Sequence, residues 1–149
     1  METLINLLEN TANYLKPAEI WTRVFSNKEL QNTIIVEYIQ QDQLFEKGVD
    51  EDGNVIGYYS AVTENFYNPM KKAGEHYTLL DTGDFYRSMV FIFGKDFFEI
   101  DADPIKQNDN LFEKYGEGII GLTEESKEKL RLELLERYEK EVRTILFGY

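Results

Sequence analysis

The 149-residue sequence contains no cysteine and only one histidine. Neither a disulfide framework nor a thiolate metal site can form, and a reducing cytoplasm is the natural setting for folding. No apolar run is long enough for a membrane span, and no basic segment precedes an apolar signal core. We therefore expect a chain that is made in the cytoplasm, stays soluble and has no contact with membranes.

Basic residues are also scarce, because 16 Lys and Arg stand against 28 Asp and Glu, which gives a formal charge of −12. Affinity for nucleic acid comes mostly from cations that neutralise phosphates, so this balance argues against a protein that grips DNA. Hydrophobic residues make up 42% of the chain and aromatic residues 14%. That is ample material for one core, and the surplus aromatics hint at protein interfaces.

The length predicts a single domain, residues 1–149, and the pattern predicts an α+β fold in three parts. Residues 1–47 form a helical N-terminal part, residues 48–122 a β-rich centre with a long loop, and residues 123–147 a C-terminal helix. The expected plan is N-terminal helices, a small antiparallel β-sheet with a central hairpin, and a long closing helix.

The N-terminal part shows apolar residues at helical spacing. Residues 2–15 read as an amphipathic helix, and Pro17 both ends it and opens a second, short helix. Ser26 with Glu29 forms a capping box before a third helix, which Gly48 is expected to stop.

The centre predicts two hairpins separated by a loop. Asp52-Gly53 is a hairpin turn signal. Residues 60–75 carry no convincing period and are expected to form a long loop with at most one helical turn. Residues 90–93 and 97–100 predict two strands that pack hard into the core.

Three further helices are predicted in the remainder of the chain, two short and one long. Asp81 or Thr82 can cap a short helix that carries Phe85 and Met89. A further helix is expected to stop at Gly116. Thr123 then caps the longest helix, which runs to about residue 146, with acidic residues in its first turn and a charged outer face.

A search for catalytic chemistry favours simpler explanations. His76 would have to combine with Ser60 or Ser88, yet no nucleophile elbow is present, so a surface histidine is the better interpretation. Asp50, Asp52 and Asn54 alternate as calcium-loop ligands do, but Val55 occupies the position where that loop needs glycine, so the hairpin turn is favoured.

Carboxylates are dense enough in the centre to raise the question of a two-metal nuclease. The residues concerned are Asp81, Asp84, Glu99, Asp101 and Asp103. Glu125-Ser126-Lys127 has a suitable spacing but falls at a helix start, not on a buried strand. An acidic rim and a helix cap explain these residues without catalysis, so we expect no catalytic, metal-binding or cofactor-binding residue and no cofactor.

The segment Tyr77-Thr78-Leu79-Leu80-Asp81-Thr82-Gly83-Asp84-Phe85-Tyr86-Arg87-Ser88-Met89 resembles the "L-x-D-T-G-x-L-x-x-S" signature of phage virion-morphogenesis, tail-completion and minor tail proteins, including head-to-tail connectors. Gly48-Val49-Asp50, Tyr59-Ser60 and the region 115–123 resemble further elements of that family, in the right order. The likeness covers residues from about 44 to 146. Phe85 stands where members often have Leu, and this chain is markedly acidic.

The resemblance implies a virion structural protein, not an enzyme, that forms a homo-oligomeric ring in the phage neck or tail. Its partners would be copies of itself and neighbouring neck or tail proteins, with assembly in the host cytoplasm. DNA would pass through the ring without sequence-specific binding. Within the motif, Thr82 and Gly83 are expected to hold a turn, while Tyr86, Arg87 and the loop 65–72 with Tyr67 face outward.

Several alternatives stay open. Ile119 and Ile120 either pack inside the molecule or, if exposed, form an assembly contact. The N-terminal helices are either a partner-docking arm or a second layer of the core. For the whole chain, the main alternative is a small acidic phage protein that binds and regulates a host protein, and a hydrolase using the central acids comes third.

Overall fold

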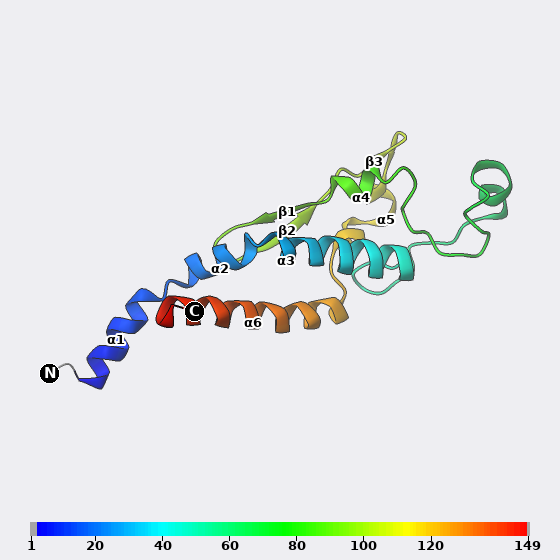
Figure 1. Cartoon of the computed structure of the whole chain (residues 1–149). Coiled ribbons are helices and arrows are strands. Elements are labelled where there is room, and N and C mark those ends of the chain that lie inside the picture. The colour runs from blue at the N-terminus through cyan, green and yellow to red at the C-terminus, as the bar shows by residue number, and fades with distance from the viewer. Residues whose placement is uncertain (1–2, 149) are drawn as a thin grey trace.

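The structure, a computed structural model, describes residues 3–148 apart from the side chain of Leu8. Figure 1 shows an elongated molecule with the N-terminal helix projecting from one end. The elements in chain order are α1 Leu4–Tyr14, α2 Pro17–Phe25, α3 Lys28–Asn32, η1 Thr33–Lys47, η2 Thr63–Tyr67, α4 Asp84–Ser88, β1 Val90–Phe93, β2 Phe98–Asp101, β3 Ile105–Lys106, β4 Asp109–Asn110, α5 Leu111–Tyr115, η3 Glu117–Ile120 and α6 Glu124–Phe147.

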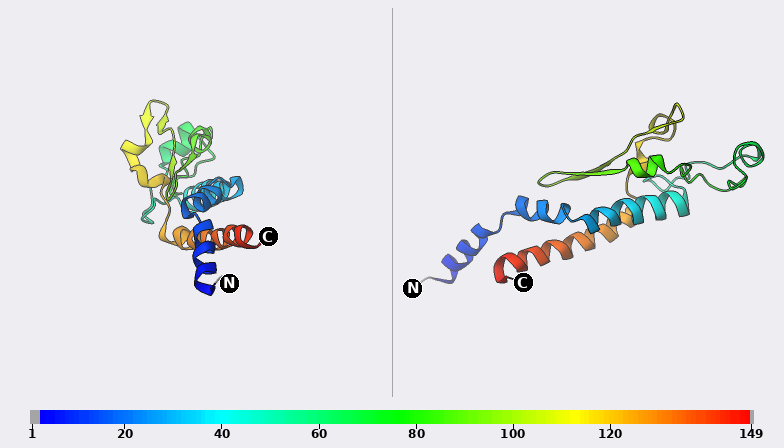
Figure 2. Two further views of the ribbon diagram at one scale, coloured as in Figure 1. Left: turned by 90° about the vertical axis from the view of Figure 1, so that its left-hand side faces the viewer. Right: turned by 45° about the horizontal axis from the view of Figure 1, so that its top comes forward.

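The body has three layers, which confirms the predicted α+β class. Helices α2, α3 and η1 follow one another along the long axis, α6 runs back along them, and the β1–β2 hairpin lies on their other side (Figures 1 and 2). Trp21 of α2 packs against Tyr138 of α6, with ring centroids 4.6 Å apart, and Phe25 packs against Phe98 of the hairpin, with ring centroids 5.6 Å apart. The aromatic residues of α2 therefore join both flanking layers.

Buried residues of the helices form most of the core, and partly buried residues of the β1–β2 hairpin pack against it. Its fully buried members include Ile20, Leu30, Ile34, Ile39, Leu44 and Ile119. Burying a side chain of this size contributes about 1.5–3 kcal/mol, so this cluster supplies much of the stability. Gly48 ends the central helix with φ of +61°, as predicted.

The third helix differs from an ordinary amphipathic helix, because it widens into a π-helix over residues 33–47. Ile34, Ile39 and Leu44 are each fully buried and each five positions apart. In a π-helix each carbonyl is bonded five residues later, so a spacing of five keeps these side chains on one face. The helix was predicted correctly, but its period was not.

The cap of this helix also differs from the prediction. Asn27 is the cap, and its side-chain oxygen accepts from the Leu30 backbone nitrogen at 2.9 Å. Ser26 instead donates to the Arg23 carbonyl at 2.9 Å. Ser and Asn cap about equally well, so the preceding helix, which still includes Phe25, decides which residue does so.

The predicted central hairpin is present, with Val90 opposite Asp101 and Phe93 opposite Phe98. The expectation that it packs hard into the core is wrong for one face. Phe91 and Phe98 turn inward, whereas Val90 and Ile92 are 49% and 39% exposed. Two strands with alternating side chains can bury only the face that meets the helices.

A second, smaller hairpin was not predicted. Ile105 pairs with Asn110, and the turn residues Gln107 and Asn108 have φ of +49° and +71°. By contrast, the Asp52-Gly53 turn is present as expected, with a bridge between Val49 and Val55. Gly53 has φ of +80°, which glycine adopts without strain.

The predicted N-terminal helix forms, with Thr3 as its cap. Its apolar side chains do not join the core, since Leu4, Ile5 and Leu7 are 71%, 67% and 51% exposed. The interpretation of the N-terminal helices as a second core layer is therefore wrong for α1, but α2, α3 and η1 do contribute buried residues to the core. None of the helices within residues 3–148 is both long and apolar enough to cross a membrane.

Candidate functional site

The motif residues Thr82 and Gly83 form the turn into α4. The Thr82 hydroxyl donates to a carboxylate oxygen of Asp84 at 2.6 Å and accepts from the Asp84 backbone nitrogen at 3.3 Å. Gly83 has φ of +85°, so a side chain there would be strained. The hydrogen bond from Thr82, followed by that from Arg87, holds the pKa of Asp84 below its usual value.

The next two motif residues have different environments. Arg87 is exposed and pairs with Asp84 one turn earlier. The expectation that Tyr86 faces outward is wrong, because it is partly buried and its hydroxyl donates to the Thr78 carbonyl. Burial raises the pKa of Tyr86. This tyrosine joins α4 to the preceding segment, and only part of its surface remains available to a partner.

The long loop carries the most exposed apolar group in the centre of the chain. Phe66, Tyr67 and Met70 are 80%, 81% and 83% exposed, and we call these three residues the apolar tip. Figure 1 shows the surrounding segment, with η2, at the end of the molecule opposite α1. The predicted outward position of Tyr67 agrees with this arrangement.

The apolar tip stands on an ordered base. Backbone hydrogen bonds join Tyr59 to Gly74 and Glu75, and a bridge joins Tyr58 to His76. Glu64 accepts from the Ala73 backbone nitrogen at 2.9 Å and pairs with Lys72 at 3.2 Å. The loop is thus closed at its root, which lowers the entropy lost when the tip binds a partner.

Ile119 and Ile120 lie inside the molecule. Ile119 is fully buried and Ile120 is 8% exposed, in the short 3-10 helix η3. The side-chain nitrogen of Gln43 donates to the Ile119 carbonyl at 3.4 Å. The interpretation of this pair as an exposed assembly contact is therefore wrong, and their role is packing.

His76 and the two serines serve separate local contacts. A ring nitrogen of His76 is 2.9 Å from the Phe45 carbonyl oxygen. Ser88 donates to the Phe85 carbonyl at 2.7 Å, and Ser60 bonds to Thr63. Within the described part of the chain, the structure does not bring either serine into hydrogen-bonding contact with His76.

The central acids are engaged in turns and ion pairs. Asp50 accepts from the backbone nitrogens of Asp52 and Asn54, which closes the hairpin turn. Asp81 lies 3.5 Å from Lys106 and 4.0 Å from Lys71. Among residues 3–148, no group of three or more acidic or histidine side chains is arranged to hold a metal ion.

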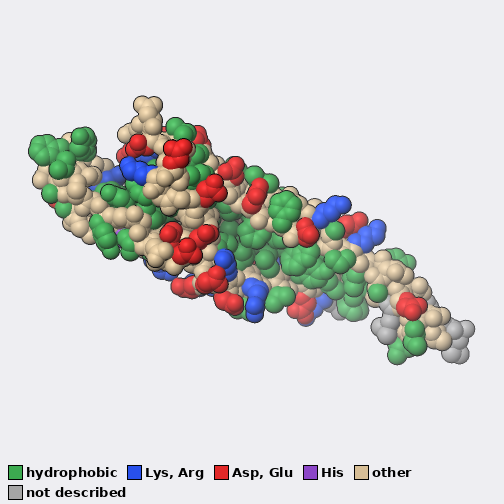
Figure 3. Space-filling model, turned by 180° about the vertical axis from the view of Figure 1, so that it is seen from behind, with side chains coloured by type: hydrophobic (Ala, Val, Ile, Leu, Met, Phe, Trp, Pro, Cys, Tyr) green, Lys and Arg blue, Asp and Glu red, His purple; other side chains and the backbone are tan. Residues whose placement is uncertain are grey.

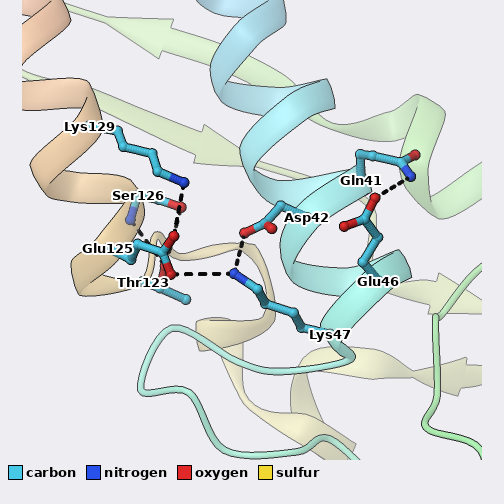
Figure 4. Close-up of polar contacts among 8 residues, drawn as sticks. All are labelled: Gln41, Asp42, Glu46, Lys47, Thr123, Glu125, Ser126 and Lys129. Atoms are coloured by element: carbon cyan, nitrogen blue, oxygen red, sulfur yellow. Dashed lines mark hydrogen bonds and ion pairs between the residues drawn. The ribbon is translucent and has the colours of Figure 1, made fainter.

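The acidic surface of α6 is neutralised locally. Arg137 pairs with Glu133 at 2.8 Å, and Lys129 pairs with Glu125 at 2.9 Å. Figure 4 shows Glu125 between Lys129 and Lys47, so the start of α6 is tied to the end of η1. Alternating pairs do not form the continuous row of carboxylates that a mimic of nucleic acid would present.

Exposed apolar side chains gather in three places. One is the projecting α1, another is the apolar tip, and the third is the middle of one long face, where charged groups surround apolar side chains (Figure 3). The sequence predicts the outward position of the loop 65–72, which contains the apolar tip, and an amphipathic helix at the N-terminus. Amphipathic spacing identifies an apolar stripe, but only the structure shows that the stripe of α1 has no layer above it.

Comparison with known proteins identifies no relative: no family model, no curated protein and no solved structure matches this chain.

Proposed function

We propose that this chain is a structural subunit of the neck or tail of a tailed phage, and that it assembles with copies of itself into a ring around the DNA channel. The observation that carries the proposal is the presence of two different exposed apolar groups at opposite ends of one elongated subunit, α1 and the apolar tip (Figure 1). A ring needs a heterologous interface, in which one patch meets a different patch on the next copy.

The motif supports the same proposal. Thr82, Gly83 and Asp84 build a compact turn that orients α4, and Arg87 remains exposed on its outer side. This is the part of the chain that resembles phage tail-completion and connector proteins. It serves as a scaffold for neighbouring surfaces, because its own hydrogen bonds are made within the turn.

Charge supports the proposed DNA channel. A net charge of −12 gives a surface that repels phosphates, so DNA would slide past without sticking. Carboxylates such as Glu99 and Asp101 lie exposed on the β1–β2 hairpin. A basic lining would attract the phosphates and hold the DNA, whereas an acidic lining repels them and lets the DNA pass.

The first test is the mass of the purified chain in solution by light scattering, followed by electron microscopy of any large species. The proposal expects a defined multiple of the 17.5 kDa chain and closed rings in the images. A chain that stays monomeric at high concentration, and that binds a host protein tightly, would favour the regulator instead.

A further inference from the structure

A groove between the helix formed by α3 and η1 and the segment around α4 offers a site for a helix from another molecule. Its volume is about 520 Å³, and Ile35, Val36, Tyr86 and Met89 supply most of its apolar surface. Val36 is 40% exposed although it lies on a helix that is otherwise central to the core. Lys28 and Arg87 both line the groove, and because Arg87 is already paired with Asp84, Lys28 supplies the positive charge here on a strongly acidic molecule.

The arm α1 has the form of a ligand for such a groove. Leu4 and Leu7 lie on one face of the helix, and Ile5 widens that face. Isolated helices shorter than about 12 residues are marginal in water, so an 11-residue helix with its apolar face exposed gains most from a partner. Amphipathic helices that bind in grooves use this spacing of apolar anchors.

Length and charge match between arm and groove. At about 1.5 Å per residue, α1 spans about 16 Å, and the groove wall runs over a similar number of residues, from Lys28 to Gln40. Glu9, four residues after Ile5, lies at the edge of the apolar face of α1. A carboxylate at that edge complements Lys28 in the groove.

The groove cannot be filled by the arm of its own chain. Helix α2 separates α1 from Lys28, and Figure 1 shows α1 pointing away from the body. If α1 folded back at Leu15 and Lys16, its length would place it over α2, before the start of the groove.

We propose that α1 of one subunit docks into the groove of a second copy, with Leu4, Ile5 and Leu7 against Ile35, Val36 and Met89. This inference rests on the proposed self-assembly and specifies its contact. Docking buries the apolar face of the arm and places Glu9 close to Lys28.

The absence of cysteine allows a direct test by disulfide trapping in the full-length chain. Chains carrying Leu7→Cys are mixed with chains carrying Val36→Cys and oxidised, since a disulfide forms only where Cα atoms approach within about 7 Å. We expect a linked pair of the two variants. The matched controls are Leu132→Cys, exposed on α6, and Ile100→Cys, which lines a second pocket together with Phe98 and Leu122.

A charge exchange gives a second readout. Glu9→Lys and Lys28→Glu should each weaken self-association by about twofold to fivefold, and the double variant should recover most of the loss. Leu7→Asp should weaken it at least about tenfold, because a carboxylate would enter an apolar groove. Since these side chains are exposed, circular dichroism should show an unchanged fold.

The outcomes separate the two proposals. A ring that persists in Leu7→Asp, with no disulfide between the Leu7→Cys and Val36→Cys chains, would overturn the arm contact while leaving the ring proposal intact. Preferential linking to Ile100→Cys would place the arm at the second pocket and overturn the assignment of the arm to the groove. A wild-type chain that is monomeric at every concentration, with no link formed between the variants, would overturn both.

Discussion

Lys47 lies 2.8 Å from Asp42, five residues earlier in the same helix, and the same ammonium group lies 3.4 Å from Glu125 at the start of α6 (Figure 4). The spacing of five follows from the π-helix, in which such residues stand one above the other. Gln41 and Glu46 repeat it, with a hydrogen bond of 3.1 Å. The hydrogen bond to Asp42, with the nearby carboxylates, raises the pKa of Lys47.

Replacing Lys47 by Met should lower the free energy of unfolding by about 0.5–1 kcal/mol, because exposed ion pairs contribute little and Lys47 is 41% exposed. Urea unfolding at low and high salt provides the measurement, and the effect should shrink in high salt. Arg131→Met, which removes a pair within α6 alone, is the control and should cost less. Equal costs would contradict a linking role for Lys47.

The buried amide of Gln43 allows a test of the core. Its nitrogen donates to Ile119, and its oxygen is buried with no hydrogen-bond partner among the described residues. Gln43→Glu should cost about 3 kcal/mol at neutral pH, since a buried carboxylate faces a carbonyl oxygen. Because burial raises the folded-state pKa of the new carboxyl above its unfolded value of about 4.3, the cost should fall as the pH drops through that raised value and should be lost by about pH 4.

The control for that variant is Gln43→Met, which removes the unpartnered oxygen and keeps the volume. Its unfolding free energy should lie within about 1.5 kcal/mol of wild type. Thermal or urea unfolding at two pH values distinguishes the variants. A Gln43→Glu chain as stable as wild type at neutral pH would show that water reaches this position.

Two glycines with left-handed backbone provide a matched pair. At Gly48 an added Cβ would lie 2.7 Å from the Tyr77 carbonyl oxygen and would also meet the His76 ring, so Gly48→Ala should cost about 2–4 kcal/mol. At Gly53 nothing lies within 4 Å, so Gly53→Ala should cost only about 1 kcal/mol. Urea unfolding measures both, and a reversed order would contradict the packing at Gly48.

Alanine variants at Ile119 and Tyr67 distinguish a role in core packing from a role in assembly. Ile119→Ala should lower stability by about 2–5 kcal/mol, because it opens a cavity in the core. Tyr67→Ala should change stability by less than about 0.5 kcal/mol, because the side chain is exposed. Light scattering of the same samples should show weaker assembly for Tyr67→Ala. Unchanged assembly in that variant would remove the apolar tip from the interface.

Glu64 predicts a pH response at the base of the apolar tip. The hydrogen bond from the Ala73 backbone, followed by that from Lys72, lowers the pKa of Glu64 from its usual 4.5. A lowered pKa in the folded chain means that these bonds stabilise the loop above pH 4.5 and are lost as the pH falls through the lowered value. The measurement is an NMR titration of Glu64 with hydrogen exchange at Ala73.

In that titration, the carboxyl midpoint should lie below 4.5, and Ala73 exchange should accelerate in the same pH range. Glu64→Gln keeps an acceptor oxygen without a titrating group, so its Ala73 exchange should show no transition there. A carboxyl midpoint at or above the usual value would contradict the hydrogen bonding at the loop base.

Features that depend on interactions between residues close together in the sequence were predicted well. Pro17 opens α2, Thr123 caps α6 and Gly48 ends η1, because caps depend on a few adjacent residues. The hairpin of residues 90–101 follows from alternating β-formers around a glycine turn. Gln107-Asn108 was missed because a turn without glycine gives a weak signal.

The candidate surfaces were predicted less well. Tyr67 was expected outside and is outside, whereas Tyr86 is tied inward by Thr78, and Ile119 and Ile120 are buried. The sequence shows that such residues are apolar, but it does not show which other segment of the chain packs over them. For the same reason, the apolar pattern of the third helix predicts an ordinary helix, whereas the structure has a π-helix that buries Ile34, Ile39 and Leu44.

By itself, then, the sequence determined the α+β class, the order of the main helices and the long charged closing helix, since caps, turns and apolar periods act over a few residues. Tertiary structure alone decided which apolar groups are buried. Trp21 meets Tyr138, and Tyr77 meets Tyr115, across segments far apart in the chain. The stripe of α1 finds no such layer, because burial depends on distant parts of the chain and not on the pattern of the helix.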